Sequence, residues 1–273
     1  MKNIKIMVIS SKGGVGKSSI SMQLIAPYLY QKTNQKVAFY EFDDENSDCL
    51  SYGDSNLTKR ELVEVSSDIL REKITDIVSK DEVACFDIGG NKTTTVVLDA
   101  LNENGMIHFI DLVVIPLLDG EQDGINASII YSILKGMRPD LKFVFILNRA
   151  KNHRYIQYQF DNYFGDIRGI FNENRSVKNY LFDEDKNKYI AMLDDDIIKY
   201  SRKFGLTIYE IAQDDRDFIS QLKLNMSTMS KEQEVKLVSF KNYIQKASKT
   251  YYEDVLQPAY KKIDEILGED NDN

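Results

Sequence analysis

One stretch near the start of the chain, residues 8–20, constrains the fold more than any other. It links a short apolar run, Ile4 to Ile9, to a helical pattern through a segment that holds three glycines and the pair Lys17-Ser18. Glycine permits a tight turn whose N–H groups reach phosphate oxygens, and the helix that follows directs its positive dipole end to the same place. Strand, glycine-rich loop and helix in this order predict a phosphate-binding loop.

The residue types in this loop suggest how a nucleotide would be held. The lysine of such loops contacts the β- and γ-phosphates and the hydroxyl after it binds Mg²⁺, which predicts these roles for Lys17 and Ser18. We expect nucleotide binding by Gly13, Gly14, Val15, Gly16, Lys17, Ser18 and Ser19. The usual formula requires a glycine where this chain has Ser11, and a second lysine, Lys12, stands directly before the glycines. The alternative is a glycine-rich turn with a chance Gly-Lys-Ser, which leaves the order of strand, loop and helix unexplained.

The segment from Lys12 to Ser18, read K-G-G-V-G-K-S, resembles the deviant Walker A motif of ParA/MinD-type ATPases, above all that of plasmid partition ParA proteins. The resemblance covers residues 1–213 and is clearest up to residue 150. It implies an ATPase that binds ATP and Mg²⁺, forms an ATP-dependent homodimer and uses Lys12 and Lys17 in catalysis, with Lys12 reaching the phosphates of the other subunit. It also implies slow hydrolysis without a partner, a centromere-binding or adaptor protein as that partner, and non-specific DNA binding.

Other strand ends carry residues to which the same resemblance gives a role. The second predicted strand is followed by Asp43, which matches the aspartate that orients the attacking water; Asp44 is the second candidate, and a solvated acidic loop is the alternative. The strand over 141–147 is followed by Asn148, which matches the asparagine that binds the adenine edge. Ordinary turn chemistry is the alternative for Asn148. Residues near 193–195 match a segment that borders the adenine.

The apolar strand over 82–88 carries a carboxylate near its end, Asp87, just before the turn Gly89-Gly90. This is a Walker B pattern, in which Asp87 would hold Mg²⁺ through a water and the glycine turn would sense the γ-phosphate. Many members of the family have proline at this turn, so Gly-Gly-Asn is a departure. Because the pattern follows a phosphate-binding loop, it indicates a magnesium site.

Apolar strands alternate with helical segments through residues 1–213. This alternation predicts an α/β fold, a mostly parallel sheet with helices on both faces as in P-loop NTPases. The candidate residues follow the carboxyl ends of strands, where ligands bind in open α/β sheets. Strands are expected over 4–9, 36–42, 82–88, 111–118, 141–147 and 189–193, and helices over 17–32, 57–80, 93–104, 119–135 and 194–204.

The remainder of the chain is predicted to lie outside the ATPase domain of residues 1–213. Residues 214–267 are expected to form a C-terminal helical extension, and residues 268–273 a disordered acidic tail. One helical stripe runs from 230 to 267. Pro258 is expected to end or bend this helix, as Pro27 is expected to kink the first one.

Residues 220–262 hold eight lysines and four carboxylates, an excess of +4 in a chain of net charge −8. One interpretation is a sequence-independent DNA-binding face that contacts phosphates. Its candidates are Lys236, Lys241, Lys246 and Lys249. The other interpretation is that the lysines solvate the outer face of a packed helix.

Composition argues against several classes of protein. Cys49 and Cys85 lack zinc-type spacing, and Cys85 lies in an apolar run that predicts a small core residue. Apolar runs stop at about eight residues, too short for a membrane span, so we expect no stable membrane anchor. The cysteine content fits a reducing cytoplasm, and the resemblance to ParA proteins implies that the protein is nucleoid-associated. A nitrogenase-reductase-like electron carrier would need two cysteines on a dimer face. The sequence is also compatible with a conjugation or mobilisation ATPase of the same superfamily, a MinD-like membrane-positioning switch and a non-enzymatic nucleotide sensor.

Overall fold

The computed structural model describes residues 3–42, 48–65, 67–103, 105–165, 176–213 and 230–268. Its strands are β1 (Lys5–Val8), β2 (Val37–Phe42), β3 (Thr58–Leu62), β4 (Ala84–Ile88), β5 (Leu112–Leu117), β6 (Lys142–Ala150) and β7 (Tyr189–Leu193). They form a seven-stranded sheet in the order β3-β2-β4-β1-β5-β6-β7, in which every neighbouring pair is parallel. The predicted α/β fold is confirmed.

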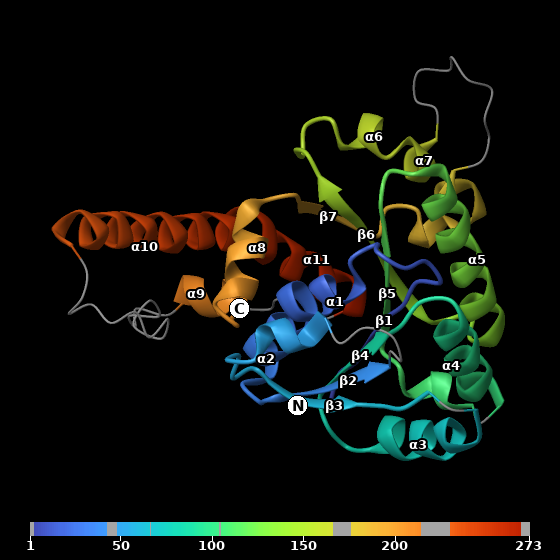
Figure 1. Ribbon diagram of the computed structural model, residues 1–273. Helices are drawn as coiled ribbons and strands as arrows, with labels where there is room; N and C mark the ends of the chain where they lie inside the picture. The colour runs from blue at the N-terminus through green and yellow to red at the C-terminus, as the bar shows by residue number, and fades with distance from the viewer. Residues whose placement is uncertain are drawn as a thin grey trace.

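Helices cover both faces of this sheet (Figure 1). One face packs against α3 (Ser67–Ser79), α4 (Lys92–Glu103) and α5 (Glu121–Met137). The other packs against α1 (Lys17–Ile20), α2 (Ala26–Thr33), α8 (Asp196–Lys203), α9 (Ile208–Gln213), α10 (Lys231–Tyr251) and α11 (Gln257–Leu267). Two short helices, α6 (Ile156–Gln159) and α7 (Asp161–Phe164), follow β6. None of the helices in the described ranges is long and apolar enough to cross a membrane.

Each face of the sheet has its own hydrophobic cluster, because successive side chains of a strand point to opposite faces. In β1, Ile6 and Val8 belong to the cluster that includes α2 and α11, whereas Met7 belongs to the cluster that includes α4 and α5. Cys85 is fully buried in the first of these clusters, as predicted. Since β1 lies between β4 and β5, the loop that follows it emerges at the middle of the carboxyl edge of the sheet.

The two helical prolines are accommodated by wider turns of helix. The first helix passes from α1 through a π-helical turn (Ser21–Ile25) into α2, and Pro27 stands at the start of α2. In the same way α10 passes through a second π-helical turn (Tyr252–Leu256) into α11, where Pro258 stands. A proline cannot donate a hydrogen bond to the carbonyl four residues earlier, and its ring crowds that carbonyl. In both helices the carbonyl concerned belongs to the π-helical turn. Pro258 therefore does not end the helix, contrary to one of the two predicted outcomes.

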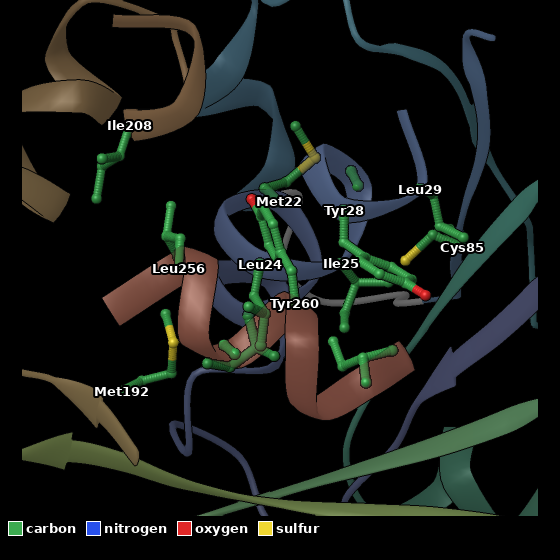
Figure 2. Packing of buried hydrophobic residues seen from close by; sticks show 14 of the residues in the cluster. Met22, Leu24, Ile25, Tyr28, Leu29, Cys85, Met192, Ile208, Leu256 and Tyr260 are labelled. Atoms are coloured by element: carbon green, nitrogen blue, oxygen red, sulfur yellow. The ribbon is translucent and has the colours of Figure 1, made fainter. Parts of the chain in front are cut away.

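The two proline-containing helices pack against each other in the core. Figure 2 shows Leu24, Ile25 and Tyr28 of the first helix beside Leu256 and Tyr260 of the last. The rings of Tyr28 and Tyr260 lie 5.6 Å apart. The C-terminal helix therefore contributes to the same core as the helix that follows the phosphate-binding loop.

The predicted helix over 57–80 is wrong in its first part. Residues 58–62 form β3, which pairs in parallel with β2 at the edge of the sheet, and the helix there, α3, begins only at Ser67. Leu62, within the range of the predicted helix, is 58% exposed. Lys59, Arg60 and Glu61 are also exposed, as is common in an edge strand. The backbone N–H and C=O groups along the open side of β2 need hydrogen-bond partners, which β3 supplies. This pairing outweighs the local helical pattern.

Candidate functional site

The phosphate-binding loop joins the end of β1 to the first turn of α1. Gly14 and Gly16 have φ values of 76° and 90°, in the left-handed region that favours glycine. Gly16 also contacts the side-chain amide of Asn148 so closely that a Cβ atom would not fit. The loop thus depends on glycine at both positions.

The two lysines of the loop are exposed to different degrees. Lys17 is only 8% exposed, and its Nζ donates a hydrogen bond to the carbonyl oxygen of Lys12, 3.2 Å away, across the loop. The side chain of Lys12 is 40% exposed. Its Nζ lies 2.7 Å from Oδ1 of Asp123, in the first turn of α5, as an ion pair without hydrogen-bond geometry. Lys17 therefore lies inside its own loop, and Lys12 lies at the surface.

A buried group of acidic side chains lies beside the loop at the ends of β2 and β4. Asp87 pairs with Val8 of β1 in register, is 3% exposed, and accepts a hydrogen bond from Ser21 Oγ at 2.9 Å. Glu41 of β2 aligns with Asp87 across the strand pair. Potential ligand atoms of Glu41, Cys49 and Asp87 all lie within 4.8 Å of one another.

The chemistry of this group fits a hard divalent cation. Two buried carboxylates with oxygens within 4.8 Å of each other favour a positive charge nearby, and Mg²⁺ prefers oxygen ligands of this kind. Burial and the neighbouring Asp87 and Glu41 raise the pKa of the Cys49 thiol, so it stays protonated. The thiol accordingly acts as a weak donor toward Asp87 at 3.8 Å and not as a thiolate ligand for a soft metal.

Glu41 is a residue that the sequence reasoning missed. The signal was present, because a carboxylate inside the otherwise apolar strand V-A-F-Y-E-F is unusual for a buried strand. Asp43, the predicted catalytic aspartate, and its alternative Asp44 lie outside the described residues. β2 ends at Phe42, at the carboxyl-terminal edge of the sheet, where Asp87 also lies.

The turn Gly89-Gly90 packs against the phosphate-binding loop. A Cβ on Gly90 would lie 3.3 Å from the backbone nitrogen of Gly13, and one on Gly89 would lie 2.5 Å from the carbonyl oxygen of Phe42. Thr94 Oγ1 lies 2.7 Å from the carbonyl of Gly89 and 3.2 Å from that of Ser10, between the two strand ends. The structure thus brings the predicted switch turn into contact with the loop; a side chain would not fit at position 89, and one at position 90 would press against Gly13.

A pocket of about 550 Å³ opens from the start of α1 toward β7 and α8. It is lined by Gly16, Ser19, Asn148, Arg149, Asp194, Asp195, Asp196, Ile198, Lys199 and Arg202. The side-chain nitrogen of Asn148 donates to the carbonyl of Val15 at 2.8 Å, and its oxygen accepts from the backbone N–H of Arg149. Asn148 therefore supports the loop from the pocket side, and its role as adenine-binding residue stays a prediction.

The four lysines proposed for DNA binding lie on α10. At about 100° per residue they spread over more than half of the helix circumference. Lys246 and Lys249 are exposed on the outward side. Lys236 is paired with Glu232 at 2.6 Å, and its side chain is 74% exposed, whereas Lys241 is half-buried. Three of the four lysines are therefore accessible, but they do not share one side of the helix.

A glycine-rich loop after the central strand of a parallel sheet, with a buried carboxylate on the adjacent strand, defines a nucleotide-binding fold of the P-loop type. No model of a protein family matches the chain, and neither does any curated protein.

Several solved structures are similar to it at low sequence identity. A putative plasmid partition protein from Borrelia burgdorferi B31 bound to AMPPNP is 13% identical, with coverage of 84% of this chain and 100% of that chain and a TM-score of 0.49. MinD cell division protein from Aquifex aeolicus is 15% identical, with coverage of 83% and 98% and a TM-score of 0.49. Cyanothece McdA(D38A) in complex with ATP is 12% identical, with coverage of 84% and 99% and a TM-score of 0.43.

Proposed function

We propose that the chain is a DNA partition or positioning ATPase that acts as an ATP-bound homodimer. The different exposure of the two loop lysines is the observation that carries this proposal. Lys17 is enclosed by its own loop, where it can contact only a phosphate bound there. Lys12 has its ammonium group at the surface, within reach of a second subunit that faces the loop.

In this proposal each residue of the site has a separate task. Lys17 and the backbone of the loop bind the phosphates, and Ser18 and Asp87 hold Mg²⁺, Asp87 through a water. The metal ion neutralises charge on the phosphate oxygens. Asp43 orients the attacking water, and Lys12 of the other subunit stabilises the charge that develops as the γ-phosphate leaves. Gly89 and Gly90 report the presence of the γ-phosphate.

The proposal extends to partners that the chain needs for a positioning role. Lys236, Lys241, Lys246 and Lys249 contribute the non-specific contacts of the dimer with DNA, and a centromere-binding or adaptor protein stimulates an otherwise slow hydrolysis. Phosphate contacts of this kind weaken steeply with salt. The protein is then cytoplasmic and nucleoid-associated, and ATP-dependent co-sedimentation with DNA, rather than with anionic liposomes, tests this part.

Two substitutions in the loop test the dimer mechanism. Lys17→Ala is expected to abolish ATP binding, measured by calorimetry with a slowly hydrolysed analogue and Mg²⁺. Lys12→Ala is expected to bind the analogue but to stay monomeric in analytical ultracentrifugation, and to lose turnover. Lys36→Ala, at an exposed position near the opposite edge of the sheet, serves as control. Equal nucleotide-dependent dimerisation of wild type and Lys12→Ala would remove the mechanism.

A further inference from the structure

One wall of the pocket contains an arginine whose side chain is held by a buried tyrosine. Arg202 of α8 lines the pocket, and its Nε donates a hydrogen bond to the hydroxyl of Tyr52 at 3.1 Å. The guanidinium carbon lies 5.9 Å from the centre of the Tyr52 ring. An arginine held by both contacts loses less conformational freedom on binding a ligand than a solvated one does.

Tyr52 is itself held by a buried polar network. It belongs to a short 3₁₀ helix, Asp48–Tyr52, and is fully buried. Its hydroxyl also accepts from Nε2 of Gln23 at 3.1 Å, and the same nitrogen lies 2.7 Å from Ser201 Oγ. The backbone N–H of Ile208 donates to Gln23 Oε1 at 2.8 Å. Four segments, including the π turn after the phosphate-binding loop, thus fix one phenol.

The chemistry of the pair suits recognition of a neutral polar ligand part. Burial raises the pKa of the Tyr52 phenol against the lowering effect of Arg202, so the hydroxyl stays neutral. Nε is one of five N–H donors of arginine, and the guanidinium plane offers a stacking face besides. The pocket joins Arg202 to Gly16 and Ser19, so a nucleotide with its phosphates on the loop and its nucleoside in this pocket would have its base and ribose near Arg202.

We propose that Arg202 is a nucleotide-binding residue that contacts the nucleoside part of the ligand, with Tyr52 as its positioning residue. This inference rests on the proposed function only in taking a nucleoside triphosphate as the ligand of the loop. The guanidinium group supplies N–H donors for the ring nitrogens of the base or for the oxygens of the ribose. Inorganic triphosphate has neither base nor ribose.

Binding of two ligands by a set of variants tests the inference. Calorimetry with Mg²⁺ compares a slowly hydrolysed ATP analogue with tripolyphosphate, which has the phosphates without the nucleoside. Arg202→Met is expected to weaken binding of the analogue by roughly 10- to 100-fold and to leave tripolyphosphate binding unchanged. Arg202→Lys keeps the charge but loses the Nε contact and the plane, so it should also weaken the analogue. Tyr52→Phe should do so by a smaller factor.

Lys203→Met is the matched control, because Lys203 is an exposed neighbour on α8 that does not line the pocket. Unchanged affinity of Arg202→Met for the analogue would show a purely structural arginine and overturn the inference. An equal loss for both ligands would place the effect on the phosphate-binding loop, and would overturn it as well. If the wild-type chain bound tripolyphosphate but not the analogue, the ATPase proposal itself would fail, and the role of Arg202 with it.

Discussion

The ion pair between Lys12 and Asp123 keeps the second lysine of the loop within its own chain in this structure. The side chain of Lys12 is 40% exposed, but that of Asp123 is only 2% exposed, and its Oδ1 has no hydrogen-bond partner among the described residues. Removing Lys12 from this carboxylate leaves a buried charge unpaired, which costs more than breaking an exposed ion pair. In the proposed dimer, a phosphate of the second subunit therefore has to outcompete Asp123 for Lys12.

Asp123→Asn should make dimerisation easier, because it removes the competing carboxylate while keeping the shape of the side chain. The ATP concentration at half-maximal dimerisation, measured by sedimentation, is expected to fall by about fivefold or more. Glu121→Gln, an exposed change in the same first turn of α5, should leave that concentration unaltered. A midpoint that rises in Asp123→Asn would mean that Asp123 supports the dimer instead.

The buried carboxylate of Asp185 is expected to make the stability of the folded protein sensitive to low pH. This fully buried carboxylate lies 2.7 Å from Tyr131 Oη, 2.9 Å from Lys135 Nζ and 2.7 Å from Lys188 Nζ. Burial acts to raise the pKa of Asp185, but the hydrogen bonds from Lys188, Lys135 and Tyr131 outweigh it and lower the pKa below its ordinary value. A carboxyl whose folded pKa is depressed stabilises the protein above the unfolded pKa, about 4, and this stability is lost as pH falls through the folded value.

The free energy of unfolding is therefore expected to fall as the pH decreases below about 4, and the fall should be smaller in Asp185→Asn. At neutral pH this substitution should cost about 3–5 kcal/mol, since it leaves two lysines with a neutral partner in a buried site. Denaturant unfolding at a series of pH values measures both effects. Asp183→Asn, an exposed change in the same segment, should behave as the wild type.

At the scale of elements, the contact between α2 and α11 combines a satisfied hydroxyl with an unsatisfied one. Tyr28 Oη donates to Asp264 Oδ1 at 2.8 Å, and Lys32 pairs with the same oxygen at 2.9 Å. The hydroxyl of Tyr260 is buried and has no hydrogen-bond partner among the described residues. A buried hydroxyl without a partner costs free energy, and so does the loss of a hydrogen bond that the folded chain makes.

Phenylalanine at the two positions should consequently have opposite effects. Tyr260→Phe is expected to raise the free energy of unfolding by about 1 kcal/mol, because it removes the uncompensated hydroxyl. Tyr28→Phe is expected to lower it by about 1 kcal/mol. Each variant is the control for the other in denaturant unfolding at pH 7, and changes of the same sign would contradict this account.

Elements whose periodicity matches their burial could be predicted from the sequence, and others could not. β1, β4 and β6 contain continuous apolar runs, and the positions of Asp87 on β4 and Asn148 on β6 follow from them. β3 could not be predicted, because its exposed Lys59, Arg60 and Glu61 carry no strand pattern and only pairing with β2 defines it. The π turns were missed because the sequence shows the proline but not how the helix adapts.

The candidate site, like the fold, could be predicted from the sequence only in part. The loop, Asp87 and the glycine turn belong to local motifs with known spacing. The wall of the pocket joins Gln23, Tyr52 and Arg202, which are far apart in the chain and meet only through the packing of the first helix against α8 and α9. No local pattern in the sequence reports such a contact.

At the scale of the whole molecule, the C-terminal helices divide into two parts. Ile263 and Ile266 of α11 lie in the core cluster shared with α2 and β6, and Lys142 Nζ donates to the carbonyl of Leu267. The first half of α10 is largely exposed, including Val235 at 61%. The division into residues 1–213 and 214–267 stays a prediction, and α11 packs as part of the sheet domain.

Ile263→Ala should lower the free energy of unfolding by about 2–5 kcal/mol, because it removes a fully buried side chain from that core. Val235→Ala, a change of the same kind on the exposed part of α10, should shift it by less than about 0.5 kcal/mol. Equal effects of the two in denaturant unfolding would mean that α11 is no more part of the core than the start of α10.

The order of the strands divides the residues of the site between two halves of the sheet. The chain lays β2, β3 and β4 on one side of β1 and β5, β6 and β7 on the other, so the loop stands at the topological switch point of the sheet. Glu41 and Asp87 come from the first half, whereas Asn148 and residues 194–196 come from the second. In the proposed function, the carboxylates beside the loop and most of the residues that line the pocket therefore come from opposite halves of one sheet.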